Sequence, residues 1–135
     1  MCLGIYLASD HSLPELAWTQ DRPAFHVAPI SESQAPVRAQ FTRAQVYHLG
    51  SHTHCGCGFA DAEDGTPEAR ATSLAALALY VTHALTLGPA EIFVCWYGEY
   101  EKPAARRFRL TAHDLAGRTD WLAELTFVEL YNPAP

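Results

Sequence analysis

The chain has 135 residues and a net charge of −6, with 49% hydrophobic residues, 18% charged residues and a single lysine, Lys102. This length and apolar content predict one folded domain with a hydrophobic core and exclude a disordered chain. The acidic balance argues against a nucleic-acid binder, and the basic cluster at residues 106–109 is more simply the solvent-facing side of a strand.

The first ten residues, MCLGIYLASD, lack the basic start, long apolar run and cleavage site of a signal peptide, so we expect a cytoplasmic protein. Thiols stay reduced in that compartment, so the four cysteines are not expected to form structural disulfides. Residues 71–90 carry no charge and have the length of a membrane span. Their threonines, serine and histidine instead favour a helix of a globular protein, with no membrane partner.

Three strands are predicted in the first half of the chain. Residues 1–8 are apolar on both faces, which is typical of a central strand. Shorter strands are predicted at residues 24–30 and at residues 45–49, the latter from its two-residue alternation. The intervening residues 9–23 and 31–36 contain prolines and polar residues, and they are predicted as loops or turns.

The main helix is predicted at residues 67–87. Thr66 is a good N-cap, Pro67 suits the first helical position, and Gly88 followed by proline ends the helix. One side carries an apolar stripe at helical spacing, and the other carries no charge, so we expect a second element or a second subunit to cover it and favour a homodimer contact. The stripe is Leu74, Leu77, Ala78, Val81 and Leu85, and the uncharged side is Thr72, Leu79, His83 and Thr86.

Residues 91–97 are apolar on both faces and predict a second central strand. Residues 106–111 are predicted to return as its antiparallel partner, followed by a capped helical turn at residues 111–115. Residues 119–126 are compatible with helix or strand, and the β-branched and aromatic residues that follow favour a final strand. The prediction is a single α+β domain over residues 1–135, with a largely antiparallel sheet packed against one main helix in the order β-β-β-α-β-β-β.

The segment between the third strand and the helix, LGSHTHCGCGF, concentrates His52, His54, Cys55 and Cys57. The C-x-C pair can chelate a transition metal, zinc first, with His52 as a third ligand and His54 as the alternate. The glycines beside the cysteines would allow positive φ and let backbone N–H groups face sulfur. A fourth ligand must come from elsewhere, and the candidates are His11, His26, His48, Asp10, Asp61 and water.

One strand arrangement would supply a partner for this loop. If the first strand ran parallel to residues 45–49, Asp10 and His11 would lie near His52. Two further cysteines, Cys2 and Cys95, lie in buried strand patterns and are expected to be core residues.

Two alternatives remain open for the loop. In a thiol-redox enzyme, His52 or His54 would activate Cys55 and Cys57 would be the resolving thiol. The predicted helix starts too far from Cys57 to activate a thiolate through its dipole. In a structural or protein-interaction domain, the same residues would only build a tight strand-to-helix connection. No nucleotide-binding or hydrolase motif is present, so no organic cofactor is indicated.

Three segments resemble a group of small bacterial proteins of unknown function. They are the MCLGIYLASD start, RPAFHV at residues 22–27, and LGSHTHCGCGF at residues 49–59. Together they cover less than a third of the chain. The resemblance implies no activity, so it assigns no role to any residue.

Overall fold

The first strand, β1 (Leu3–Ser9), lies in the middle of the sheet, and all seven of its residues are buried. The computed structural model describes residues 2–21, 24–60 and 66–133. Its other strands are β2 (Phe25–Pro29), β3 (Gln45–Ser51), β4 (Ala90–Trp96), β5 (Arg106–Leu110) and β6 (Thr126–Leu130). Its α-helices are α1 (Pro67–Leu87) and α2 (Ala112–Gly117), and its 3-10 helices are η1 (Glu32–Gln40) and η2 (Gly56–Gly58).

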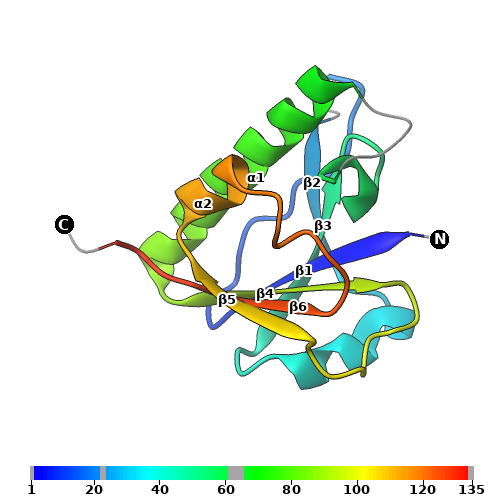
Figure 1. The fold of residues 1–135 in the computed structure, drawn as a ribbon, viewed down its shortest axis with the longest axis vertical. Helices are drawn as coiled ribbons and strands as arrows, with labels where there is room; N and C mark the ends of the chain where they lie inside the picture. Colours follow the sequence, from blue (N-terminus) through cyan, green and yellow to red (C-terminus); the bar gives the residue numbers. More distant parts are fainter. Residues whose placement is uncertain (1, 22–23, 61–65, 134–135) are drawn as a thin grey trace.

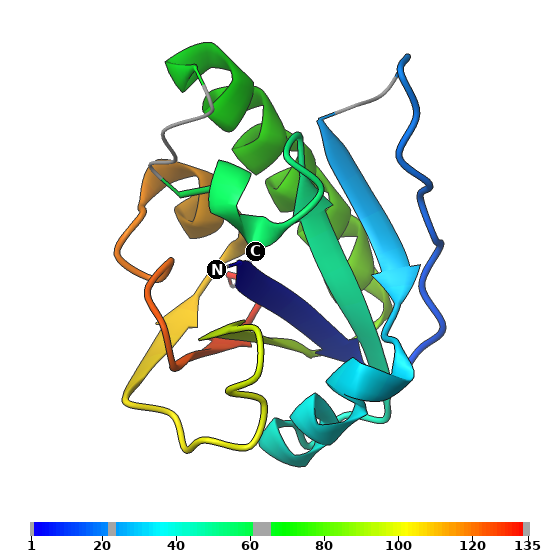
Figure 2. The same ribbon diagram turned by 90° about the vertical axis from the view of Figure 1, so that its right-hand side faces the viewer.

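The six strands form one sheet in the order β2-β3-β1-β4-β6-β5, in which every pair is antiparallel except β5 with β6. Helices α1 and α2 cover one face of this sheet, and η1 covers the other (Figures 1 and 2). The predicted fold class is confirmed: a single α+β domain with one main helix on a largely antiparallel sheet.

Each face of the sheet has its own hydrophobic core because the central strands are apolar on both sides. Leu3, Ile5 and Leu7 of β1 face α1, whereas Tyr6 and Ala8 face the side covered by η1. The same division holds in β4, as the alternation in both sequences predicted. Both faces of the sheet must therefore be covered by other elements. On the face away from α1, η1 packs against the sheet through the buried side chain of Val37.

Helix α1 has the predicted limits. The hydroxyl of Thr66 accepts a hydrogen bond from the backbone N–H of Ala69 at 3.1 Å, which satisfies one of the free donors at the helix start. The four large residues of the predicted stripe are buried in the core beneath the helix, and Ala78 is half-buried. The four are Leu74, Leu77, Val81 and Leu85. In the described chain, neither α-helix is long and apolar enough to cross a bilayer.

One prediction about local structure is wrong, and one open question is answered. Residues 31–36 were expected to form a turn, but most of them belong to η1, which begins where the backbone N–H of Ser31 donates to Gln34 Oε1 at 3.0 Å. Residues 119–125, which were compatible with helix or strand, form neither and lie in turns and irregular structure. β6 starts at Thr126, so the predicted final strand is confirmed.

The pairing of residues 106–111 also differs from prediction. β5 was expected beside β4, but β6 lies between them and pairs with β5 in parallel. The connection through α2, which includes the predicted capped turn, is a crossover of the kind that parallel strands require. Arg106, Arg107 and Arg109 are exposed on β5, and charges of this kind protect an edge strand from pairing with other chains.

Candidate metal centre

Antiparallel pairing brings the residue before β1 beside the loop that follows β3. Ile5 lies opposite Leu49, so the start of β1 and the end of β3 are at the same edge of the molecule. Cys2 immediately precedes β1, and Ser51 is the last residue of β3. The strand register therefore places Cys2 next to the cysteine loop.

The same register separates the loop from the partners that the sequence suggested. The parallel arrangement that would have brought Asp10 and His11 near His52 is not found: β1 and β3 are antiparallel, so these residues follow the opposite end of β1. Asp10 instead pairs with Arg43, with 2.9 Å between Oδ2 and Nη1. His11 lies beside Gly88 at the end of α1.

The loop packs directly onto β1 because it contains glycine at its closest approach. A Cβ at Gly56 would lie 2.7 Å from the carbonyl oxygen of Leu3 and 2.8 Å from the side chain of Ile5. The prediction that the loop glycines have positive φ is wrong: neither Gly56 nor Gly58 does, and His54 has φ 71° instead. The absence of a side chain at Gly56 thus allows the loop to pack closely against β1. As a result, the loop lies next to Cys2.

Three sulfur atoms meet where the loop contacts β1. The Sγ atoms of Cys2, Cys55 and Cys57 all lie within 4.8 Å of one another, and each residue is partly exposed. The prediction that Cys2 is a core residue is wrong, whereas Cys95 is fully buried as expected. Cys2 was missed because its apolar neighbours suggested burial. Its place at the very start of a strand, combined with antiparallel pairing, was the signal that could have identified it.

The three thiols differ in the direction in which the protein shifts their pKa values. Burial alone would raise the pKa of Cys55, but hydrogen bonds from the Cys57 backbone N–H, the Thr53 hydroxyl and the neighbouring thiols outweigh it and hold that pKa below its ordinary value. Burial and the adjacent charge of Cys55 raise the pKa of Cys2 and of Cys57. The backbone N–H of Leu3 donates to Cys57 Sγ at 3.2 Å. Of the three thiols, Cys55 is therefore the one that loses its proton at the lowest pH. Backbone N–H groups donate hydrogen bonds to the sulfurs of Cys55 and Cys57.

The two loop histidines make other contacts. His52 Nδ1 is 2.9 Å from the hydroxyl oxygen of Ser73 on α1, and Ser73 in turn donates to the Ala24 carbonyl oxygen at 2.6 Å. The ring of His54 stacks on Trp18, with 4.4 Å between centroids. In the described part of the chain, the group of ligand atoms close enough to share an ion contains three cysteines and neither histidine.

The remaining fourth-ligand candidates do not join this group either. His26 and His48 lie side by side, with 5.9 Å between ring centroids, and the His26 ring occupies the space over Gly50. Asp61 lies outside the described residues. The described residues thus offer three protein ligands from two segments of the chain.

Tyr97 connects the sulfur group to the histidines. Its backbone N–H donates to the Cys2 carbonyl oxygen at 2.9 Å, and its hydroxyl is 3.1 Å from His48 Nε2. Burial raises the pKa of Tyr97 to about 12, and the negative charges of Cys55 and Cys2 add to this. Tyr97 is therefore a neutral hydrogen-bonding group next to the thiols.

No protein-family model, curated protein or solved structure matches the chain.

Proposed function

We propose that the protein binds one transition-metal ion, zinc first, through the thiolates of Cys2, Cys55 and Cys57. The observation that carries the proposal is the approach of the three Sγ atoms to within 4.8 Å of one another. Zinc bound to sulfur at about 2.3 Å in a tetrahedron needs sulfurs about 3.8 Å apart, which small side-chain rotations provide here. An iron–sulfur cluster suits the site less well because the common clusters are held by four cysteines, and three come together among the described residues.

The hydrogen bonds around the sulfurs support this proposal. Ligand sulfur must be deprotonated, and N–H groups that face a thiolate lower the cost of its negative charge. Leu3 supplies such a donor to Cys57, and Cys57 supplies one to Cys55. Tyr97 and the short loop then hold the thiols together before any metal arrives, so little ordering entropy opposes binding.

Three protein ligands leave one coordination position for water or an exogenous ligand. Zinc sites of this composition are open, in contrast to the closed four-ligand sites that only support a fold. The partial exposure of all three cysteines gives the ion and a small ligand a path to the site. We infer that the metal is exchangeable or takes part in chemistry, and that His52 and His54 shape the loop.

Metal analysis of the purified, tag-free protein tests this ligand set. We expect close to one zinc per chain, and a serine at position 2, 55 or 57 should weaken binding by more than the tenfold to about hundredfold that loss of an outer-shell partner causes. Cys95→Ala is the matched control because it removes a thiol outside the group. His52→Ala distinguishes the two ligand sets suggested for the loop, and it should keep most of the affinity.

Two outcomes would end the proposal. One is a parent protein that contains no metal and takes up none from a zinc buffer. The other is a Cys2→Ser variant that binds zinc as tightly as the Cys95→Ala control while retaining its fold.

A second function, thiol-redox chemistry, is favoured by the close approach of the three Sγ atoms and by the hydrogen bonds that lower the pKa of Cys55. A peroxide could oxidise the Cys55 thiolate to a sulfenic acid, and a neighbouring thiol would then displace water from it to form a disulfide. Site-resolved alkylation of metal-free protein against pH tests this. The rate at Cys55 should have its midpoint below about 8.5, the ordinary pKa of a free thiol, and a midpoint at or above that value would count against an activated Cys55.

A further inference from the structure

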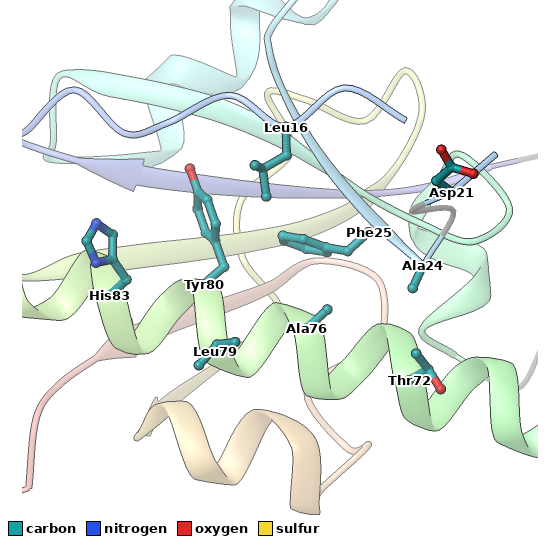
Figure 3. Close-up of a pocket in the computed structure, with 9 residues that line it drawn as sticks. All are labelled: Leu16, Asp21, Ala24, Phe25, Thr72, Ala76, Leu79, Tyr80 and His83. Carbon is teal, nitrogen blue, oxygen red and sulfur yellow. The ribbon is translucent and has the colours of Figure 1, made fainter. Parts of the chain in front are cut away.

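An apolar groove runs along α1 on a part of the molecule that the sulfur group does not use (Figure 3). Its volume is about 660 Å³. The segment that precedes β2 forms the opposite wall, and Figure 3 shows Leu16 and Phe25 facing Ala76 and Tyr80 across it. Leu79 stands beside the groove with 74% of its surface exposed, the most exposed large apolar side chain of the described residues.

The groove is preformed because its outer wall is fixed to the rest of the protein. Leu16 and Val27 exchange two backbone hydrogen bonds, at 3.0 Å and 2.9 Å. The hydroxyl of Tyr80 donates to the Pro14 carbonyl oxygen at 2.6 Å, which ties the same wall to α1. An occupant would therefore fill existing space and would not have to separate the wall from the helix.

The exposed side of α1 is less polar than its threonines suggest. The hydroxyls of Thr72, Thr82 and Thr86 donate to backbone carbonyl oxygens of α1 itself, at 2.9, 2.8 and 2.6 Å. These hydroxyl groups therefore already have hydrogen-bond partners within the helix. Covering this surface leaves no hydroxyl without a partner, so the usual cost of burying a polar group is absent.

Charge limits what can cover this surface. The protein has a net charge of −6, so two copies repel one another unless they meet through a face without like charges. The exposed side of α1 comes close to such a face, since residues 71–90 contain no charged side chain and Asp21 is the one acidic residue among the described residues that line the groove. A protruding Leu79 and a groove that can receive a leucine lie on this same face, which is the arrangement that a twofold dimer requires.

The two polar groups at the ends of the groove are also complementary. Asp21 lies at the same end of the groove as Thr72, on the opposite wall, and His83 lies at the other end (Figure 3). Thr72 and His83 are separated by about 16 Å along the helix, with the midpoint between Ala76 and Leu79. A twofold axis at that midpoint would place His83 of each copy opposite Asp21 of the other.

From this match we infer that a second copy of the chain occupies the groove. The dimer is isologous, its two α1 helices run antiparallel about an axis between Ala76 and Leu79, and each Leu79 enters the groove of the other copy beside Ala76. The helix alone presents a strip about 31 Å long and about 11 Å wide. Because a standard interface buries about 800 Å² on each partner, the wall around Leu16 must also be part of the contact.

Sedimentation over a range of chain concentrations tests the dimer. We expect the parent to dimerise and Leu79→Glu to raise the dissociation constant about thirtyfold or more, because an anchor side chain at the centre of the interface is lost. Ala116→Glu, at an exposed position of α2, is the matched control and should dimerise like the parent. Circular dichroism and thermal melts of each variant establish that it is folded.

Three results would overturn the inference: a parent that remains monomeric at millimolar concentration, a folded Leu79→Glu variant that dimerises like the parent, or an equal loss in Ala116→Glu. The antiparallel arrangement has its own test. His83→Asp should weaken the dimer by placing two carboxylates together, and adding Asp21→Lys should restore most of the affinity. A double variant as weak as His83→Asp alone would overturn this arrangement.

Discussion

At the scale of single residues, His48 illustrates how burial changes proton binding. Its ring is almost fully covered between Tyr6, His26 and Tyr97. Burial and the neighbouring His26 lower the pKa of His48 from 6.5 to about 4. The unfolded chain therefore binds a proton at this residue in a pH range where the folded protein does not, and folding stability depends on pH there.

The free energy of unfolding should fall as the pH drops from about 6.5 to about 4. In this window the unfolded state holds more protons than the folded state, so acid favours unfolding. A shift of this size corresponds to about 3 kcal/mol. His26, whose pKa burial also lowers, acts in the same direction. Urea titrations at a series of pH values would measure the slope.

A His48→Gln variant serves as the control for this pH dependence. Glutamine can still hydrogen-bond the hydroxyl of Tyr97 but does not titrate, so the slope between about pH 6.5 and pH 4 should become shallower. A variant with the same slope as the parent would show that another group controls acid unfolding.

Gly50 provides a steric prediction at the same scale. A Cβ at this position would lie 1.7 Å from the His26 ring, so Gly50→Ala forces that ring out of its contacts with His48 and His54. We expect a loss of about 1 to 3 kcal/mol, as for other overpacked sites. In a His26→Ala background the same substitution should cost much less, and additive losses in a double-mutant cycle would contradict the steric explanation.

At the scale of secondary-structure elements, α1 depends on its cap. Thr66→Ala removes the hydroxyl that accepts from Ala69, so we expect it to lower the free energy of unfolding by about 1 kcal/mol. Thr82→Ala is a matched control on the same helix because its hydroxyl bonds only to the Ala78 carbonyl oxygen, which has an intrahelical partner already. Chemical denaturation would show whether the effect belongs to the cap or to threonine in general.

The elements differ in how well the sequence predicted them. Helix α1 was located to the residue because its cap, its proline and its terminal glycine are all local signals. β5 was recognised as a strand but assigned the wrong neighbour, since local alternation does not encode which strand lies beside it. The 3-10 helix η1 was missed because its one buried residue, Val37, provides no periodic pattern.

At the scale of the whole molecule, a bound metal ion would cross-link two segments that are far apart in the sequence. Cys2 and the loop cysteines are more than fifty residues apart in the chain, and an ion bound to all three would hold the start of β1 against the loop. At free zinc about one hundred times above its dissociation constant, binding adds about 2.7 kcal/mol of stability. We expect a rise in melting temperature of about 10 °C.

This stabilisation should disappear in Cys57→Ser and persist in Cys95→Ala, when all proteins are melted at one chain concentration. Fixing the concentration matters because dimerisation would also raise the melting temperature. A zinc-dependent rise that survives in Cys57→Ser would show that the ion binds elsewhere.

The sequence by itself determined the α+β class, the two central strands, the main helix and its uncharged side, and the C-x-C pair as the place to look for chemistry. These features follow from side-chain periodicity and capping, which act over a few residues. Only the tertiary structure decided that Cys2 joins Cys55 and Cys57, that His52 bonds to Ser73, and that a groove lies beside Leu79. Each of these depends on strand register and on packing between distant segments, and the hydrophobic pattern of one segment carries no information about its neighbours in space.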